Sequence, residues 1–379
     1  MKLYQYVIRR LILAVFVLLA IAAIVFVLLR GPLPPESVLA PYITPKMGDA
    51  EKLQLARSLG VATASCPSYT AFAQRAAGCV VPLYQQFFAW LETAVFKGNW
   101  GFSNLPGISG LGETTLQVFS AKFPYTAELA ITGSALTIIV ALPLGIVSAT
   151  HNNKLPDHFS RLFALLGYSV PIFVFGYLLQ LVFGLYISIP SGGGFSKGLL
   201  PISGAFAQNC AICFSNPGTV KAYTGAPIFD GLLSGNLPYF WDGLVAMFLP
   251  ALALTVTTIA ALTRILRSSM LEALRQDYIL LARSKGLRNR VVIYRHALRN
   301  ALLPAITVSG LIIAFLFGGA VLVETVFALP GIGAAAVAAA VVFDVNFLEL
   351  YILVTAFIIV LANLSVDIIY AKLDPRIRY

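Results

Sequence analysis

The chain has 379 residues, of which 59% are hydrophobic and only 11% charged, and its mean hydropathy is +0.85. This composition excludes a water-soluble globular protein, because too little polar surface is present to cover a fold of this size. The formal net charge of +10 fits cytoplasmic loops beside anionic lipid headgroups better than it fits nucleic-acid binding.

Six stretches are apolar over the length that a helix needs to cross a bilayer, roughly 20 residues for a core about 30 Å thick. They lie near residues 10–29, 127–150, 162–188, 243–263, 303–323 and 350–370. The central part of each contains no Lys, Arg, Asp or Glu, as hydrocarbon requires. The first stretch is predicted to remain as an anchor. Its apolar run, Leu11 to Leu29, is longer than a signal-peptide core, and no small-residue cleavage site follows it.

Positive charge indicates the orientation of these stretches, because cytoplasmic segments near membrane ends collect Lys and Arg. If the N-terminus is inside, the cytoplasmic pieces hold 17 of the 26 basic residues, and nine of those 17 lie between Arg264 and Arg299. The remaining basic residues are spread over the much longer segments 31–126 and 189–242. We therefore expect a multi-pass protein of the cell membrane with both termini in the cytoplasm.

These features predict an all-α integral membrane protein with six transmembrane helices and two extracytoplasmic insertions. The expected parts are the N-terminal cytoplasmic end with the first helix (1–30), an extracytoplasmic segment (31–126), helices two and three (127–188), an extracytoplasmic insertion (189–242), and helices four to six (243–379) with a cytoplasmic loop (264–302).

All four cysteines fall in the two extracytoplasmic segments, where oxidation is favoured. Cys66 and Cys79 lie in the first segment, and Cys210 and Cys213 form C-x-x-C in the second. Disulfides are the favoured interpretation. Local pairing is the simplest connectivity, but a bridge between the segments stays open. A zinc site would need two further ligands, and the three histidines are all predicted on the other side of the membrane, so we expect no metal site.

Local patterns predict further elements. Asp49 to Leu59 reads as a short amphipathic helix, and the aromatic-rich Val81 to Phe96 suits a helix at the membrane interface or on the protein's outer face. Pro171 should kink the third span, because proline removes one helical hydrogen bond. Asp367 lies near the cytoplasmic end of the last span, where snorkelling to the interface or an arginine partner would suffice, so we do not expect it to carry protons.

The cytoplasmic loop is the most informative stretch. Positive-inside bias alone explains much of its charge, but its pattern adds more. Asp277 to Lys285 predicts a helix, and Gly286 is a helix-ending residue. A second short helix is predicted from Asn289 to Leu302, ending at Pro304. Two short helices joined at a glycine form a rigid projection that another protein can grip.

The runs A-R-S-K-G-L, at 282–287, and R-H-A-L-R-N-A-L-L-P, at 295–304, resemble the signature loop of ABC-importer permeases, in the form of the oligopeptide and dipeptide group. In that family the loop holds a coupling helix that sits in a cleft of the ATPase subunit. The resemblance assigns this role to Ala282, Arg283, Ser284, Lys285, Gly286 and Leu287, with Arg295, His296, Arg299, Asn300 and Pro304 supporting the loop. Leu280 stands where the general importer motif begins with a glutamate. Gly286 and Pro304 are also farther apart in the sequence than the glycine and proline of the general motif. Both departures suit the peptide group.

Other motifs of the same group occur in the same order. They are the N-terminal Y-x-x-R-R (6–10), G-N-W-G-F-S (98–103), P-Y-T-A-E (124–128), Y-S-V-P-I-F (168–173), V-E-T-V-F-A-L-P-G-I-G (323–333) and L-D-P-R-I-R (373–378). Each is weak alone, but together they extend the resemblance over most of the chain outside the cysteine-containing segments.

The resemblance implies a permease subunit of an ATP-driven importer, which is not itself an enzyme and has no catalytic residue or cofactor of its own. It implies ATP and Mg²⁺ on two partner ATPase subunits, a second homologous permease and an extracytoplasmic solute-binding protein. Peptides are the implied substrate, with oligosaccharides and nickel complexes as alternatives within the family. An ion-coupled secondary transporter is the rival from another class, but the spans lack mid-membrane charge and an evident inverted repeat. A membrane enzyme lacks a supporting motif, and the chain has no P-loop.

Overall fold

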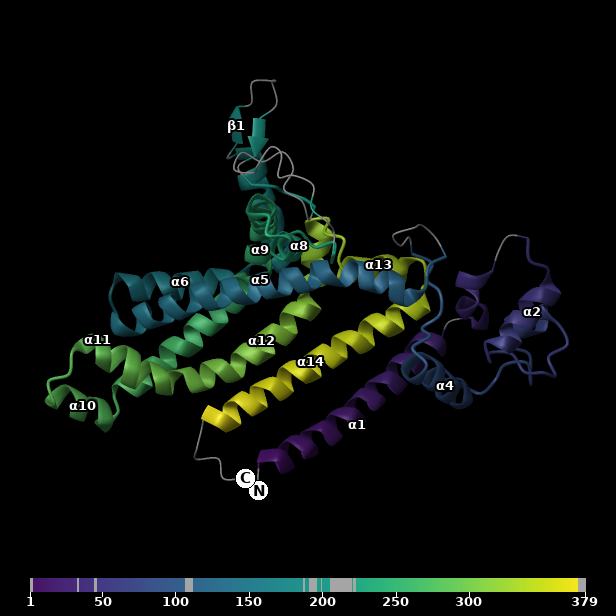
Figure 1. Cartoon of the computed structure of the whole chain (residues 1–379), viewed down its shortest axis with the longest axis horizontal. Coiled ribbons are helices and arrows are strands. Elements are labelled where there is room, and N and C mark those ends of the chain that lie inside the picture. The colour runs from purple at the N-terminus through teal and green to yellow at the C-terminus, as the bar shows by residue number, and fades with distance from the viewer. Residues whose placement is uncertain are drawn as a thin grey trace. The chain divides into compact units, whose positions relative to one another are not determined.

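A computed structural model describes residues 3–32, 34–43, 46–105, 112–186, 188–190, 196–198, 200–204, 220 and 223–373. Within these residues the architecture is helical (Figure 1). One short antiparallel pair, β1 (Ser188–Pro190) and β2 (Ser196–Gly198), is added to the predicted all-α fold, with Ser188 opposite Gly198. Cys210 and Cys213 lie outside the described residues.

The long helices are α1 (Leu3–Arg30), α5 (Thr115–Thr150), α9 (Leu237–Leu274), α12 (Leu298–Val326) and α14 (Val345–Leu373). The shorter ones are α2 (Asp49–Ser58), α3 (Tyr69–Ala73), α4 (Leu83–Leu91), α6 (Leu155–Ser169), α7 (Ile172–Gln180), α8 (Pro227–Ser234), α10 (Asp277–Ser284), α11 (Asn289–Val291) and α13 (Ile332–Val341). Two 3₁₀ turns, η1 (Pro35–Val38) and η2 (Ala40–Tyr42), and three π-helical segments, η3 (Glu92–Phe96), η4 (Leu181–Tyr186) and η5 (Val292–Ala297), complete the set. The helices predicted at 49–59 and 81–96 are confirmed as α2 and as α4 with η3.

Four helices in the described part of the chain are long and apolar enough to cross a membrane, namely Val7–Arg30 of α1, α5, α9 and Val345–Ile368 of α14. The pair formed by α6 and Ile172–Gly184 becomes a fifth if it is counted as one broken span. The remaining predicted span, 303–323, lies within α12, whose 29 residues are about 43 Å long and therefore exceed the thickness of a bilayer core.

The third predicted span is a broken helix and not a continuous one. α6 ends at Ser169 and α7 begins at Ile172, with a bend of 105° between them. Val170 is extended, the conformation that a following proline favours, and Pro171 caps α7. The kink expected at Pro171 is thus a complete break.

The chain divides into two compact units. The first consists of 1–10, 125–330 and 358–379, and the second of 11–124 and 331–357.

In the first unit α9 is the central helix, and α12, α8, α6 and α7 all pack against it. Leu254, Ile259 and Leu266 along α9 are almost fully buried, as expected for a helix covered on several sides. Gly167 allows α6 to approach α9, because a Cβ there would lie 3.1 Å from the Cβ of Ala260. Near the chain termini, Arg10 forms an ion pair with Asp367 at 3.3 Å, which is one of the two arrangements expected for this carboxylate.

The second unit contains two clusters of buried side chains. One surrounds Phe72 and Leu39 and includes a disulfide between Cys66 and Cys79, which joins the segments flanking α3. The other packs the start of α5 and α14 against α13, around Phe347 and Ala339. The part of 31–126 that contains α2 and α3 therefore has a small core of its own.

Candidate functional site

The loop that the sequence analysis selected lies in the first unit, between the end of α9 and α12. Figure 1 shows α10 and α11 at one end of α12. α10 begins at Asp277, whose carboxylate in the first turn favours the positive end of the helix dipole. Its last turn carries Arg283, which suits the negative end. The predicted first helix of the loop is confirmed.

The turn after α10 is a Schellman motif centred on Gly286. The Gly286 N–H donates to the Arg283 carbonyl at 2.9 Å, and the Leu287 N–H donates to the Ala282 carbonyl at 3.3 Å. Gly286 has φ +72°, the left-handed region that a side chain disfavours. A glycine at this position therefore lets the last carbonyls of α10 find donors in a tight turn.

One face of α10 is fixed to the first unit. Ile279 and Ala282 are buried, and they belong to the same cluster as Met270 of α9, Val292 of η5 and Ala301 of α12. These contacts hold α10 against the helices on either side of the loop. The short helix is thereby stabilised by packing, since eight residues alone would not remain helical in water.

The opposite face of the loop is exposed and combines apolar and basic side chains. Leu280 is 64% exposed, Leu281 58%, Tyr294 53% and Leu287 40%. The exposed basic residues beside them are Arg283, Lys285, Arg288, Arg290 and Arg295. We call these nine residues the loop face. Large apolar groups ringed by charge on a surface are typical of a protein interaction site.

The second half of the loop differs from its predicted form. α11, η5 and α12 follow one another without a break, so the second helix does not end at Pro304 but continues through it to Val326. Proline inside a helix removes one hydrogen bond, and the packing of α12 against α9 offsets this loss. The π-helical turn at 292–297 is wider than an α-turn. Val292 at its start and Ala297 at its end are both buried. The loop is therefore continuous with α12.

The structure separates the sequence-selected residues into groups. Ala282 lies on the buried face, while Arg283, Ser284, Lys285, Gly286 and Leu287 are exposed together at the end of α10. In the second half Arg295, Arg299 and Asn300 are exposed and His296 is half-buried. Pro304 is exposed on α12, apart from the turn.

A buried carboxylate that the sequence analysis did not select lies in the first turn of α6. Asp157 of α6 is fully buried and accepts hydrogen bonds from Nε and Nη2 of Arg267, at 2.6 and 3.0 Å, and from the hydroxyl of Ser148 at 2.7 Å. Arg161 forms a further ion pair with it. Asp157 thus links the end of α5, the start of α6 and α9. The signal in the sequence was one acidic residue four positions before an arginine in a basic segment.

Two buried glutamates of the first unit were also missed. Glu128 of α5 accepts the Ile228 N–H in the first turn of α8, and Glu324 of α12 accepts a hydrogen bond from the Thr126 hydroxyl at 2.6 Å. Both lie within motifs that the sequence analysis quoted, P-Y-T-A-E and V-E-T. Their role is to tie α5 to α8 and to α12.

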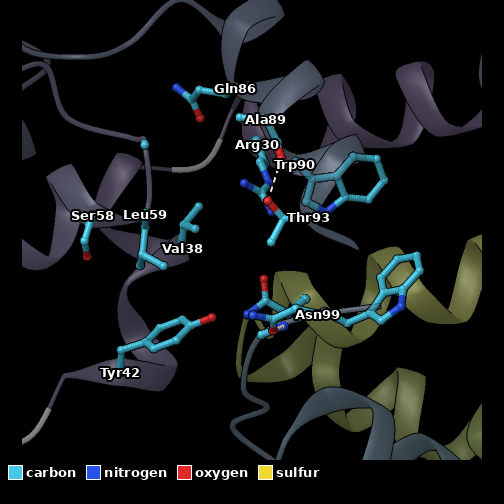
Figure 2. A pocket seen from close by; sticks show the side chains of 14 residues that line it. Arg30, Val38, Tyr42, Ser58, Leu59, Gln86, Ala89, Trp90, Thr93 and Asn99 are labelled. Carbon is cyan, nitrogen blue, oxygen red and sulfur yellow. Dashed lines mark hydrogen bonds between the residues drawn. The ribbon is translucent and has the colours of Figure 1, made fainter. Parts of the chain in front are cut away.

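The second unit contains a pocket of about 330 Å³ (Figure 2). Val38, Leu59 and Tyr42 lie on one side of it, opposite Thr93 and Arg30. Nε and Nη2 of Arg30 donate to the carboxylate of Glu349 at 2.7 and 2.9 Å. Burial raises the pKa of Tyr42, whose oxygen accepts the Phe102 N–H at 3.4 Å. Arg30, the charged residue that lines the pocket, is already paired with Glu349.

In the described part of the chain, no group of three or more His, Cys, Asp or Glu side chains is arranged to hold a metal ion.

The chain is similar to membrane components of binding-protein-dependent transport systems. A family model described as "Binding-protein-dependent transport system inner membrane component" matches residues 141–379. The chain is 38% identical over 297 residues to a probable D,D-dipeptide transport system permease protein of Escherichia coli K12, covering 78% of this chain and 80% of the relative. It is 39% identical over 270 residues to a dipeptide transport system permease protein of Alkalihalophilus pseudofirmus, covering 70% and 75%. An oligopeptide transport system permease protein of Bacillus subtilis is 30% identical over 374 residues, which is 99% of each chain.

Proposed function

Because the chain belongs to the family of binding-protein-dependent transport system inner membrane components, we propose that it forms half of a translocation pathway for peptides delivered by an extracytoplasmic binding protein. Membership makes the chain a permease subunit of an ABC importer, and ATP hydrolysis takes place on a separate subunit. Peptides are favoured as substrate because the relatives are named for D,D-dipeptides, dipeptides and oligopeptides. Oligosaccharides and nickel complexes are the alternatives.

The loop face is the proposed contact with the ATPase. The observation that carries this assignment is the two-sided construction of α10, with Ile279 and Ala282 buried against the first unit and Leu280 and Leu281 exposed. A partner that grips the exposed side moves a helix that is already fixed to its neighbours. Apolar centres with a basic rim favour a cleft with apolar walls and acidic edges.

The continuity of the loop with α12 supports a mechanism for the coupling. Force applied at the Gly286 turn reaches α12 through η5 without an intervening flexible linker. It also reaches α9 through the buried side of α10. Closure of the ATPases would therefore displace α9 and α12 together, and these two helices pack against each other along the first unit.

The proposed topology has six spans. Four are the helices that are long and apolar enough to cross a membrane, and the other two are α12 and the α6–α7 pair. Both termini and the loop face are placed in the cytoplasm, in accordance with the distribution of basic residues. Residues 31–126 and 189–242 are then extracytoplasmic. The Cys66–Cys79 disulfide in the first of these segments is consistent with an oxidising compartment.

The proposed assembly contains a second homologous permease and two ATPase subunits, which bind ATP and Mg²⁺. The extracytoplasmic binding protein docks on the outer segments. The test is affinity purification of the chain from its native membrane in mild detergent, followed by mass spectrometry. Recovery of a second permease, nucleotide-binding subunits and a binding protein is the expected result. A chain that is recovered alone and transports without ATP would contradict the proposal.

The substrate is tested with the binding protein recovered in that experiment. Its affinity for dipeptides, oligopeptides, oligosaccharides and nickel complexes is compared by calorimetry. We expect a peptide to bind most tightly, and uptake of the same peptide to require ATP in reconstituted vesicles. Preference for a sugar or a nickel complex would contradict the peptide assignment and leave the importer assignment intact.

A further inference from the structure

A second pocket, of about 340 Å³, opens in the first unit between α6 and the last turns of α9. α6 contributes Arg161, Leu165 and Tyr168, and α9 contributes Thr263, Arg264 and Arg267. Its volume lies within the range of small-ligand sites, about 300 to 1,000 Å³. The α9 residues lie about two to three turns before the end of that helix at Leu274, so the pocket is close to the loop end of the first unit.

The pocket has an excess of positive charge. Three guanidinium groups line it, and Asp157 beneath them is the carboxylate that pairs with Arg161 and Arg267. Arg264 is held differently. Its guanidinium stacks on the Tyr168 ring, 4.8 Å from the centroid, and Nη2 donates to the Tyr168 hydroxyl at 3.2 Å. One carboxylate does not balance three arginines, and Arg264 is fixed without an acidic partner among the contacts described.

The rest of the pocket is apolar and continues onto an apolar surface. Leu165 is 68% exposed at the pocket, and Leu162 and Leu166 on the same helix are 55% and 57% exposed. A free inorganic anion would leave this apolar surface uncovered. An anion that carries hydrocarbon satisfies both the arginines and the leucines.

We propose that this pocket binds the phosphate headgroup of an anionic phospholipid of the cytoplasmic leaflet, with the Arg264 guanidinium contacting the phosphate and Leu165 contacting the acyl chains. The assignment to the cytoplasmic leaflet rests on the proposed function, which places the loop in the cytoplasm. The pocket lies at the end of α9 that leads into this loop. Basic pockets between transmembrane helices on the cytoplasmic side are typical lipid-headgroup sites. A bound lipid would brace α6 against the helix that leads into the loop face.

The test is native mass spectrometry of the whole detergent-purified assembly titrated with phosphatidylglycerol or with phosphatidylcholine. We expect phosphatidylglycerol to bind in preference. Arg264→Gln should lower its affinity about five-fold, the effect of one basic residue at a membrane surface. Lys154→Gln is the matched control, since it removes one charge from the exposed turn before α6 and outside the pocket lining.

Several outcomes would overturn the proposal. They are equal retention of the two lipids, an equal effect of Arg264→Gln and Lys154→Gln, and displacement of the lipid by inorganic phosphate at the same concentration. Cross-linking from a photoreactive residue at position 165 adds an independent measurement. Labelling of phosphatidylglycerol supports the proposal, whereas labelling of a neighbouring subunit alone shows that protein covers the pocket. Recovery of the ATPase and binding-protein partners is scored separately, so failure of the lipid site is distinguishable from failure of the importer assignment.

Discussion

The side-chain amide of Asn300 donates a hydrogen bond to the hydroxyl of Tyr278 at 2.9 Å. The two residues are 22 positions apart and lie on opposite sides of the Gly286 turn, one in α10 and one in α12. The bond therefore joins the start of α10 to α12 beside Ile279 and Ala301, which belong to one buried cluster. The hydrogen bond and the buried contacts together hold α10 against α12.

Removing this bond should loosen α10 without unfolding the subunit. Tyr278→Phe keeps the ring and removes the hydroxyl, at a cost of about 0.5 to 1.5 kcal/mol. We expect faster hydrogen exchange in 277–287 within the purified assembly and a lower ratio of uptake to ATP hydrolysis. Tyr177→Phe, an exposed tyrosine on α7, is the matched control. Unchanged exchange in α10 would show that the bond contributes nothing to the loop.

The left-handed conformation of Gly286 gives a second prediction. A Cβ at this position would meet nothing within 4 Å, so a substitution acts through backbone strain alone. Gly286→Val should cost about 1 to 2 kcal/mol, because a β-branched residue strongly disfavours φ +72°. The subunit should still insert, while ATP hydrolysis proceeds with reduced uptake.

Gly286→Asn is the control for this prediction, because asparagine tolerates the left-handed region and should retain most coupling. Both variants place a side chain on the exposed turn, so a difference between them isolates the backbone effect. Full uptake by Gly286→Val, or equal loss in both variants, would contradict the role of the Schellman turn.

The ion pairs of Asp157 predict unequal effects of removing its two arginine partners. Asp157 is fully buried and Arg267 mostly so, at 0% and 20% side-chain exposure, whereas Arg161 is 44% exposed and screened by water. Arg267→Gln should therefore destabilise the subunit by about 3 to 5 kcal/mol, because it removes the main partner of a buried carboxylate, and Arg161→Gln by less than about 1 kcal/mol. Thermal unfolding of the detergent-solubilised assembly measures both. Equal effects of Arg161→Gln and Arg267→Gln would show that exposure does not rank these two contacts.

The Cys66–Cys79 disulfide should stabilise the small core around Phe72. Closing a loop of this size, with a sequence separation of 13, is worth about 3 kcal/mol in the chain-entropy account. The double variant Cys66→Ser/Cys79→Ser should become sensitive to limited proteolysis between 49 and 80, and reduction of the wild-type protein should have the same effect. Equal resistance of the oxidised wild type and the variant would contradict this prediction.

The same core decides how the proposed docking of the binding protein on 31–126 can be tested. Deleting 67–78 would remove Phe72, which is fully buried, so lost uptake would report unfolding and not lost docking. Exchanging exposed residues of α2 for alanine is the cleaner experiment. Binding-protein affinity is then measured with the core intact.

The coarse architecture could be predicted because hydrocarbon imposes simple rules. Spans are long and apolar, and charge gathers outside them, so α1, α5, α9 and α14 follow from hydropathy alone. The turn at Gly286 could be predicted because a glycine after a helical pattern ends the helix through its own backbone conformation, without contacts from distant residues. Pro171 marked a break for the same reason, although the bend of 105° depends on how α6 and α7 pack against α9.

The continuation of α12 through Pro304 could not be predicted, because proline in water ends a helix and only tertiary packing offsets its cost. The Asp157 network was invisible for another reason. Its partners Ser148, Arg161 and Arg267 come from three helices, and nothing in the separation of 110 residues between Asp157 and Arg267 indicates contact.

The membrane class, the family motifs and the position of the loop can be read from the sequence, because each depends on composition or on residues adjacent in the chain. The buried side of α10 and the gathering of guanidinium groups beside α9 are visible only in the folded chain. Those properties depend on contacts between residues far apart in the chain. Burial and electrostatic pairing act through space, so local sequence cannot specify them.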